Sequence, residues 1–177
     1  MSVADPARYG QIARLLHWLA ALLLIITFGL GAGMDYVGHS PWHDRMFNWH
    51  RAFGVVVLGV IVVRLLWRLT HPAPPLPASI SGAQTLAAHM THWLLYLLLI
   101  AQPMLGWLGE SAFGSSVPVF RLFELPPIIP KDEALAKVIF GMHEWVAWAI
   151  LAVVVVHIAA ALYHTVRGDG VLKRMWW

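Results

Sequence analysis

The stretch VIFGMHEWVAWAILAVVVVHIAAALY, residues 138–163, decides the fold class. It is longer than the roughly 20 helical residues that cross a bilayer, and Glu144 is its only Asp, Glu, Lys or Arg. Two histidines, His143 and His157, interrupt its apolar run. Because a polar side chain inside a membrane span is costly and usually functional, this stretch predicts a transmembrane helix that carries a functional site.

Three further stretches are apolar and long enough to cross a membrane: residues 15–34, 47–69 and 89–108. Of the 177 residues, 59% are hydrophobic and 12% are charged, whereas a soluble domain carries about 25% charged residues. The sequence therefore predicts an all-α integral membrane four-helix bundle surrounded by lipid, with residues 1–177 as a single membrane domain. The first stretch lacks a clear small-residue cleavage pattern, so we expect it to be a retained helix.

The absence of cysteine restricts the cofactors that the chain can hold. Disulfides, c-type haem attachment, cysteine-ligated iron–sulfur clusters and thiolate zinc sites are excluded. A bound metal or haem iron must use histidine, methionine or oxygen ligands. The net charge of +3 is spread along the chain without a basic run, so no nucleic-acid partner is expected.

Prolines mark the connections between the predicted spans. Residues 71–77, HPAPPLP, cannot be helical and join the second and third spans. Residues 109–137 form the longest connection, in which we expect a short helix near residues 131–137. Lys and Arg are modestly more frequent on the side of the termini and the proline-rich segment. The positive-inside rule then predicts an inner-membrane protein with both termini in the cytoplasm and residues 109–137 in the periplasm.

The histidines within the spans predict two cofactors at two depths. His143 and His157 lie fourteen residues apart on one helix, so their rings share nearly one face and are separated by roughly 21 Å along the axis. We expect His17 at the depth of His157 and His50 at the depth of His143. Axial histidine pairs suit haem iron, and the core of a helical bundle commonly holds such a cofactor. The pattern thus predicts one haem between His17 and His157 and another between His50 and His143.

For other residues near these two predicted sites, the sequence allows two alternative roles each. His89 and His92, three residues apart on one helix face, either contact a haem propionate or a quinone, or lie at the wet interface. His164 either exchanges protons with a quinone headgroup or is an interfacial side chain. Several glycines either leave room for a flat porphyrin or allow close helix packing: Gly29, Gly31, Gly33 and Gly54.

Six short motifs follow one another along the chain: RLLHW at 14–18, HRAFG at 50–54, VRLLWR at 63–68, HMTH at 89–92, GMHE at 141–144 and HIAAALYH at 157–164. In this order and spacing the chain resembles the bacterial cytochrome b561 family of di-haem membrane proteins over nearly its whole length. The resemblance implies haem b ligands at His17, His50, His143 and His157. It also implies a quinone near the cytoplasmic haem, where Arg14, His89, His92 and His164 are the candidate contacts. In the best-understood members it implies oxidation of superoxide at the outer face.

The leading functional hypothesis is therefore an enzyme. Periplasmic superoxide gives one electron at a time to the outer haem, the electron passes to the inner haem, and two such events reduce one ubiquinone. Arg51 and Lys137 are candidates to attract the anion by electrostatic steering, which must be local because the outer connections carry more acids than bases.

Two other functions are compatible with a histidine-rich membrane bundle. The first is a membrane electron carrier for a periplasmic redox protein, which would dock on residues 109–137. The second is a metal transporter, which would cluster its ligands at one depth. The pairs at two depths argue against the transporter, whereas the carrier remains open.

Overall fold

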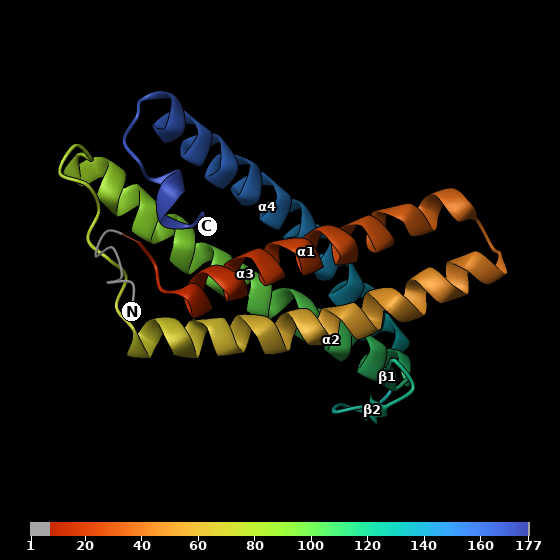
Figure 1. The fold of residues 1–177 in the computed structure, drawn as a ribbon. Coiled ribbons are helices and arrows are strands. Elements are labelled where there is room, and N and C mark those ends of the chain that lie inside the picture. Colours follow the sequence, from red (N-terminus) through yellow and green to blue (C-terminus); the bar gives the residue numbers. More distant parts are fainter. Residues whose placement is uncertain (1–7, 177) are drawn as a thin grey trace.

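The computed structural model describes residues 8–176 and consists mainly of four long helices (Figure 1). The helices are α1 (Gln11–Val37), α2 (Pro41–Thr70), α3 (Gly82–Phe113) and α4 (Glu133–Val166). An antiparallel hairpin of β1 (Val117–Val119) and β2 (Phe123–Leu125) and a short 3-10 helix, η1 (Leu172–Arg174), complete the described part. All four long helices are long and apolar enough to cross a membrane, as the sequence predicts.

Local sequence determines where the helices begin and end. At the start of α2, the Ser40 side chain accepts a hydrogen bond from the backbone N–H of His43. At the start of α3, Ser81 and Gln84 form a capping box, in which each side chain accepts from the backbone N–H of the other residue. The helix ends at Phe113 and is capped by Gly114, whose φ of +90° lies in the left-handed region that glycine adopts without a Cβ clash.

The helices extend beyond the predicted spans. α3 begins at Gly82, so His89 lies about two turns inside the helix instead of opening it. The short helix expected near residues 131–137 does not exist as a separate element, because Asp132 caps α4 and the residues that follow form its first turns. The 34 residues of α4 span about 51 Å, more than the roughly 30 Å of hydrocarbon in a bilayer. The helix ends therefore project past the apolar layer.

The four helices form two antiparallel pairs that cross one another (Figure 1). α1 packs along α2, α3 packs along α4, and α2 contacts α3 between the pairs. Within residues 8–176, α4 makes no more than isolated close backbone contacts with α1 or α2. We call the end that holds the start of α1 and η1 the termini end, and the end that holds β1 and β2 the hairpin end (Figure 1).

Buried side chains are few. The larger cluster joins three helices through Ala20 and Leu23 of α1, Val57 and Ile61 of α2, and Tyr96 of α3. A smaller cluster joins α3 and α4 near the hairpin end. Many large apolar side chains elsewhere on the helices are exposed, which fits a bundle whose outer surface faces lipid.

The C-terminal segment folds back over the start of α1. Arg174 is buried, and its guanidinium donates to two backbone carbonyls of the proline-rich segment. The backbone N–H of Tyr9 donates to the Arg174 carbonyl, and the indole N–H of Trp18 donates to the Met175 carbonyl over 2.8 Å. These bonds tie the N-terminal end, the proline-rich segment and the C-terminus together at the termini end.

Candidate functional site

His50 of α2 and His143 of α4 face each other toward the hairpin end. Their ring centroids lie 6.0 Å apart, with an angle of 78° between the ring planes. Nδ1 of His50 lies 2.9 Å from the carbonyl oxygen of Thr27 on α1, and Nδ1 of His143 lies 2.9 Å from that of Gln102 on α3. A neutral imidazole that donates through Nδ1 keeps a lone pair on Nε2. Both rings are thus oriented by a neighbouring helix while a ligand nitrogen stays available.

Two glycines let those neighbouring helices approach the rings. A Cβ atom on Gly31 of α1 would lie 3.0 Å from Cε1 of His50, and one on Gly106 of α3 would lie 3.3 Å from Cε1 of His143. The other glycines singled out in the sequence meet neither ring within 4 Å: Gly29, Gly33 and Gly54. Gly106 was not among the glycines singled out in the sequence.

Three histidines converge toward the termini end. His157 of α4 lies 6.3 Å, between ring centroids, from His17 of α1 and 5.5 Å from His92 of α3. All three line a small cavity of about 50 Å³, together with Arg64 and Tyr96. Nδ1 of His17 and Nδ1 of His92 are buried without a protein hydrogen-bond partner. The structure therefore brings His17 and His157 together, and it adds His92 as a second neighbour of His157.

Arg64 adds a positive charge to this cavity. Its guanidinium carbon lies 5.7 Å from the ring centroid of Tyr96, and the side chain is half-buried. Within residues 8–176 no carboxylate forms an ion pair with it. Because a buried charge without a counter-charge is costly, the cavity suits a bound group that carries negative charge.

The donor sets at both ends fit haem. Two imidazoles that bind one metal from opposite sides, at about 2 Å per bond, place their ring centroids about 6 Å apart. The two predicted pairs have centroid distances of 6.0 and 6.3 Å. No group of three His, Cys, Asp or Glu side chains in the described residues forms a site for a bare metal ion. Haem, whose macrocycle supplies the in-plane nitrogens, needs only axial ligands from the protein.

The other candidate contacts for a quinone or a propionate are dispersed. His92 lines the termini-end cavity, whereas His89, on the same helix, is exposed. Nδ1 of His164 lies 2.6 Å from Oδ2 of Asp169, in the turn that follows α4. Arg14 donates to the Trp176 carbonyl over 2.8 Å. Of the four candidates, only His92 therefore lies in the histidine cluster.

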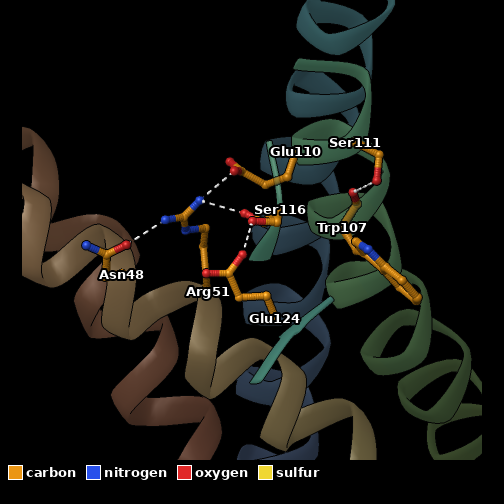
Figure 2. Close-up of polar contacts among 7 residues, drawn as sticks. All are labelled: Asn48, Arg51, Trp107, Glu110, Ser111, Ser116 and Glu124. Atoms are coloured by element: carbon orange, nitrogen blue, oxygen red, sulfur yellow. Dashed lines mark hydrogen bonds and ion pairs between the residues drawn. The ribbon is translucent and has the colours of Figure 1, made fainter. Parts of the chain in front are cut away.

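Arg51, one of the two candidates for attracting an anion, forms a buried ion pair. Its Nη1 lies 2.6 Å from Oε2 of Glu110, and the two side chains are only 15% and 7% exposed. The same guanidinium donates to Asn48 and to the carbonyl of Ser116, so it joins α2 to the end of α3 and to the residue before β1 (Figure 2). The ion pair neutralises the Arg51 charge, which makes Arg51 a weaker candidate for attracting an anion than an unpaired cation would be. Lys137, exposed near the start of α4, is the stronger steering candidate.

Comparisons with known proteins agree with the resemblance in the motifs. A family model described as prokaryotic cytochrome b561 matches residues 8–177. "Cytochrome b561 homolog 2" of Escherichia coli (strain K12) is 36% identical over 173 residues, which cover 96% of this chain and 92% of the relative. "Probable superoxide oxidase CybB" of Yersinia pestis is 32% identical over 171 residues, which cover 95% of each chain. "Cytochrome b561 homolog 1" of Escherichia coli is 26% identical over 175 residues, 95% of this chain and 96% of the relative.

Proposed function

Because the chain belongs to the prokaryotic cytochrome b561 family of bacterial membrane electron-transfer cytochromes, which bind haem b, we propose that it is a superoxide:ubiquinone oxidoreductase with two haem groups. His50 and His143 would hold one haem, and His17 and His157 would hold the other. The observation that supports this most is the pair of facing imidazoles at each of two levels of α4, roughly 21 Å apart along the helix.

The chain's own residues would hold and isolate the haems. Each bound haem supplies an iron that accepts and releases a single electron. Because two histidines would hold each iron, the protein would leave no open coordination site for oxygen species. At the hairpin end, the Thr27 and Gln102 carbonyls fix the ring orientations and make the imidazoles more basic. At the termini end, Arg64 would balance the negative charge of a propionate.

Replacing Arg64 with glutamine should weaken the hold on the haem at the termini end. Losing a charge-assisted contact of about 1.5–3 kcal/mol corresponds to about ten- to 150-fold in affinity. Arg64→Lys, which keeps the charge, should retain much more haem. The check is haem per chain during incubation with a haem-scavenging apoprotein. Equal rates of haem loss from the wild type and from Arg64→Gln would contradict the propionate role.

The proposed electron donor is superoxide, by similarity to the relative named as a probable superoxide oxidase. Two superoxide anions would each give up one electron and leave as O2, while one ubiquinone would gain two electrons and two protons and become ubiquinol. With the termini in the cytoplasm, as the Lys and Arg distribution predicts, superoxide would react on the periplasmic side. His164, paired with Asp169, is the proposed group that passes cytoplasmic protons to the quinone.

Lys137 is the proposed residue for attracting superoxide. It is exposed on α4, six residues before His143. Lys137→Ala should slow superoxide oxidation about two- to tenfold at low ionic strength, and the difference should shrink as salt screens the charge. Lys131→Ala is the matched control, since its charge is already paired with Glu133 at 2.9 Å. Identical rates for Lys137→Ala and the wild type at every salt concentration would remove the steering role.

A superoxide reduction assay tests the proposed reaction itself. The purified, oxidised protein in detergent is exposed to enzymatically generated superoxide, with and without superoxide dismutase, while the haem α band is followed. We expect rapid reduction that the dismutase abolishes, followed by turnover when ubiquinone is added. Haem bands that stay oxidised under superoxide, in a protein that dithionite still reduces, would refute the superoxide reaction and leave a di-haem carrier.

A second candidate function, an electron carrier for a soluble redox protein, is favoured by the hairpin tip. Phe120, Leu122 and Phe123 are 42%, 80% and 52% exposed, on a connection that lies beyond the helices. Clustered apolar side chains on such a surface are typical of protein interaction sites. A soluble redox protein that co-purifies with the wild type but not with a Leu122→Ser variant would support this function.

A further inference from the structure

A hollow at the hairpin end is separate from the histidine site of that end. It has a volume of about 490 Å³ and lies between α2 and the β-hairpin. Arg45, Asn48 and Trp49 line it from α2, and Phe120 and Arg121 line it from the turn between β1 and β2. The wall therefore combines two guanidinium groups, one amide and two aromatic rings.

The hollow lies on the face of α2 that points away from His50. Its α2 residues, Arg45, Asn48, Trp49 and Ala52, follow the spacing i, i+3, i+4, i+7 and so share one helix face. At about 100° per residue, His50 points roughly 150° away from the middle of that face. The His50 ring is accordingly bonded to Thr27 of α1 and does not line the hollow. A ligand in the hollow would thus sit across α2 from the proposed haem.

The polar groups of the hollow are suited to an anion. Arg45 and Arg121 form no ion pair within residues 8–176, and Arg45 stacks on the Trp42 ring at 4.9 Å. Oδ1 of Asn48 already accepts a hydrogen bond from Arg51 over 2.5 Å, which leaves the amide nitrogen as a donor. Among the residues that the structure describes, no carboxylate lines the hollow. Paired guanidinium groups are well suited to the oxygens of a phosphate.

The two turn residues that line the hollow have an unusual backbone conformation. Phe120 has a φ of +46° and Arg121 a φ of +63°, in the left-handed region that residues with a Cβ rarely adopt. The Phe120 ring also packs against Phe53 of α2 at 5.1 Å, which holds the turn against the helix. These two residues are the centre of the hairpin turn, which the Leu122 N–H closes by donating to the Val119 carbonyl, and a tight hairpin turn of this kind requires a positive φ at both positions.

Size and location indicate what the ligand is. A diatomic anion occupies about the volume of one water molecule, roughly 30 Å³, and would leave most of the hollow empty. Cavities of this size take multi-atom ligands. The hollow opens near the start of α2, where Trp42 and Trp49 are 58% and 47% exposed, and exposed tryptophans there are typical of the membrane interface. The ligand should therefore carry both an anionic group and an apolar body.

We propose that this hollow binds the headgroup of an anionic phospholipid from the leaflet on the hairpin side. Arg45 and Arg121 contact the phosphate, and Trp49 and Phe120 contact the glycerol and the first methylenes. The bound lipid bridges α2 and the hairpin turn. Because the site lies across α2 from His50, it stands independently of the proposed redox reaction.

The test compares lipid retention by the haem-loaded protein and by a variant with Arg45→Gln and Arg121→Gln. Phosphatidylglycerol is added in detergent, and bound lipid is counted by native mass spectrometry while thermal unfolding is followed. The wild type should retain one phosphatidylglycerol and unfold at a higher temperature, and the variant should bind it about tenfold more weakly or worse. Arg167→Gln with Lys173→Gln removes the same charge from exposed residues at the termini end and should bind like the wild type.

Three results would overturn the proposal. The first is equal retention of phosphatidylglycerol by the hollow variant and the wild type, with unchanged haem spectra to show that both are folded. The second is equal retention of zwitterionic phosphatidylcholine by the wild type, which would remove the selectivity for net charge. The third is stabilisation by inorganic phosphate alone as large as that by phosphatidylglycerol, which would make the site one for a soluble anion.

Discussion

Replacing His157 with alanine should leave the purified protein with one haem per chain instead of two, and His143→Ala should remove the other haem instead. α4 supplies one imidazole to each proposed site, and haem held by a single remaining histidine dissociates readily because half of its axial bonding is lost. The measurement is haem per polypeptide, together with the reduced-minus-oxidised α-band spectrum. The bands that the two variants lose should differ and should add up to the wild-type spectrum.

The termini-end site offers a matched comparison, because His157 has two histidine neighbours. His17 lies at 6.3 Å and His92 at 5.5 Å, both measured between ring centroids. If His17 is the ligand, His17→Ala should lose the same haem as His157→Ala, whereas His92→Ala should keep both. The opposite result would assign the ligand to His92. Two haems retained in both His143→Ala and His157→Ala would refute the proposal that α4 supplies axial ligands.

The depth of each histidine could be predicted because helix rise is regular. Four apolar stretches of sufficient length set the number of helices, and their antiparallel order sets which ends share a membrane face. The spacing of His143 and His157 then fixes two levels, and His17 and His50 fall at those levels by counting residues. The structure brings the members of each pair together, with 6.3 Å between the ring centroids of His17 and His157 and 6.0 Å between those of His50 and His143.

The rotation of each helix about its axis could not be predicted. In a membrane bundle, the lipid-facing and the bundle-facing side chains are both apolar, so the sequence pattern does not separate the two faces. His89 and His92 illustrate this, because one is exposed and the other lines a cavity. The hydrogen-bond partners of the His50 and His143 rings could not be predicted either. Thr27 and Gln102 accept through their backbone carbonyls, which every residue type carries.

The ion pair between Arg51 and Glu110 could not be predicted from the sequence for a related reason. Arg51 and Glu110 lie 59 positions apart, and nothing in the sequence between them indicates that they pair. The length of α3 and the packing of the β-hairpin against α2 bring the two groups together out of water. Counting charges along the sequence treats both side chains as exposed, whereas in the fold they form a buried ion pair with no net charge.

Arg51→Ala should destabilise the protein by about 3–5 kcal/mol, because it leaves the Glu110 carboxylate buried without its counter-charge. Removing Arg51 also breaks its bonds to Asn48 and to the Ser116 carbonyl, so the contact between α2 and the hairpin should loosen. The free energy of unfolding, measured by titration from mild detergent into sodium dodecyl sulfate, gives the size of the effect. Haem content should be recorded alongside, since Arg51 directly follows His50.

Two comparisons separate the buried pair from a general effect of lost charge. Lys131→Ala breaks the ion pair with Glu133, whose side chains are 61% and 64% exposed, and should cost only about 0–1 kcal/mol. Replacing both Arg51 and Glu110 with leucine removes the uncompensated charge as well as the pair, so it should recover much of the stability lost in Arg51→Ala. If Arg51→Ala were no more destabilising than Lys131→Ala, the guanidinium would have to be solvated and free, and Arg51 would again be a strong candidate for attracting an anion.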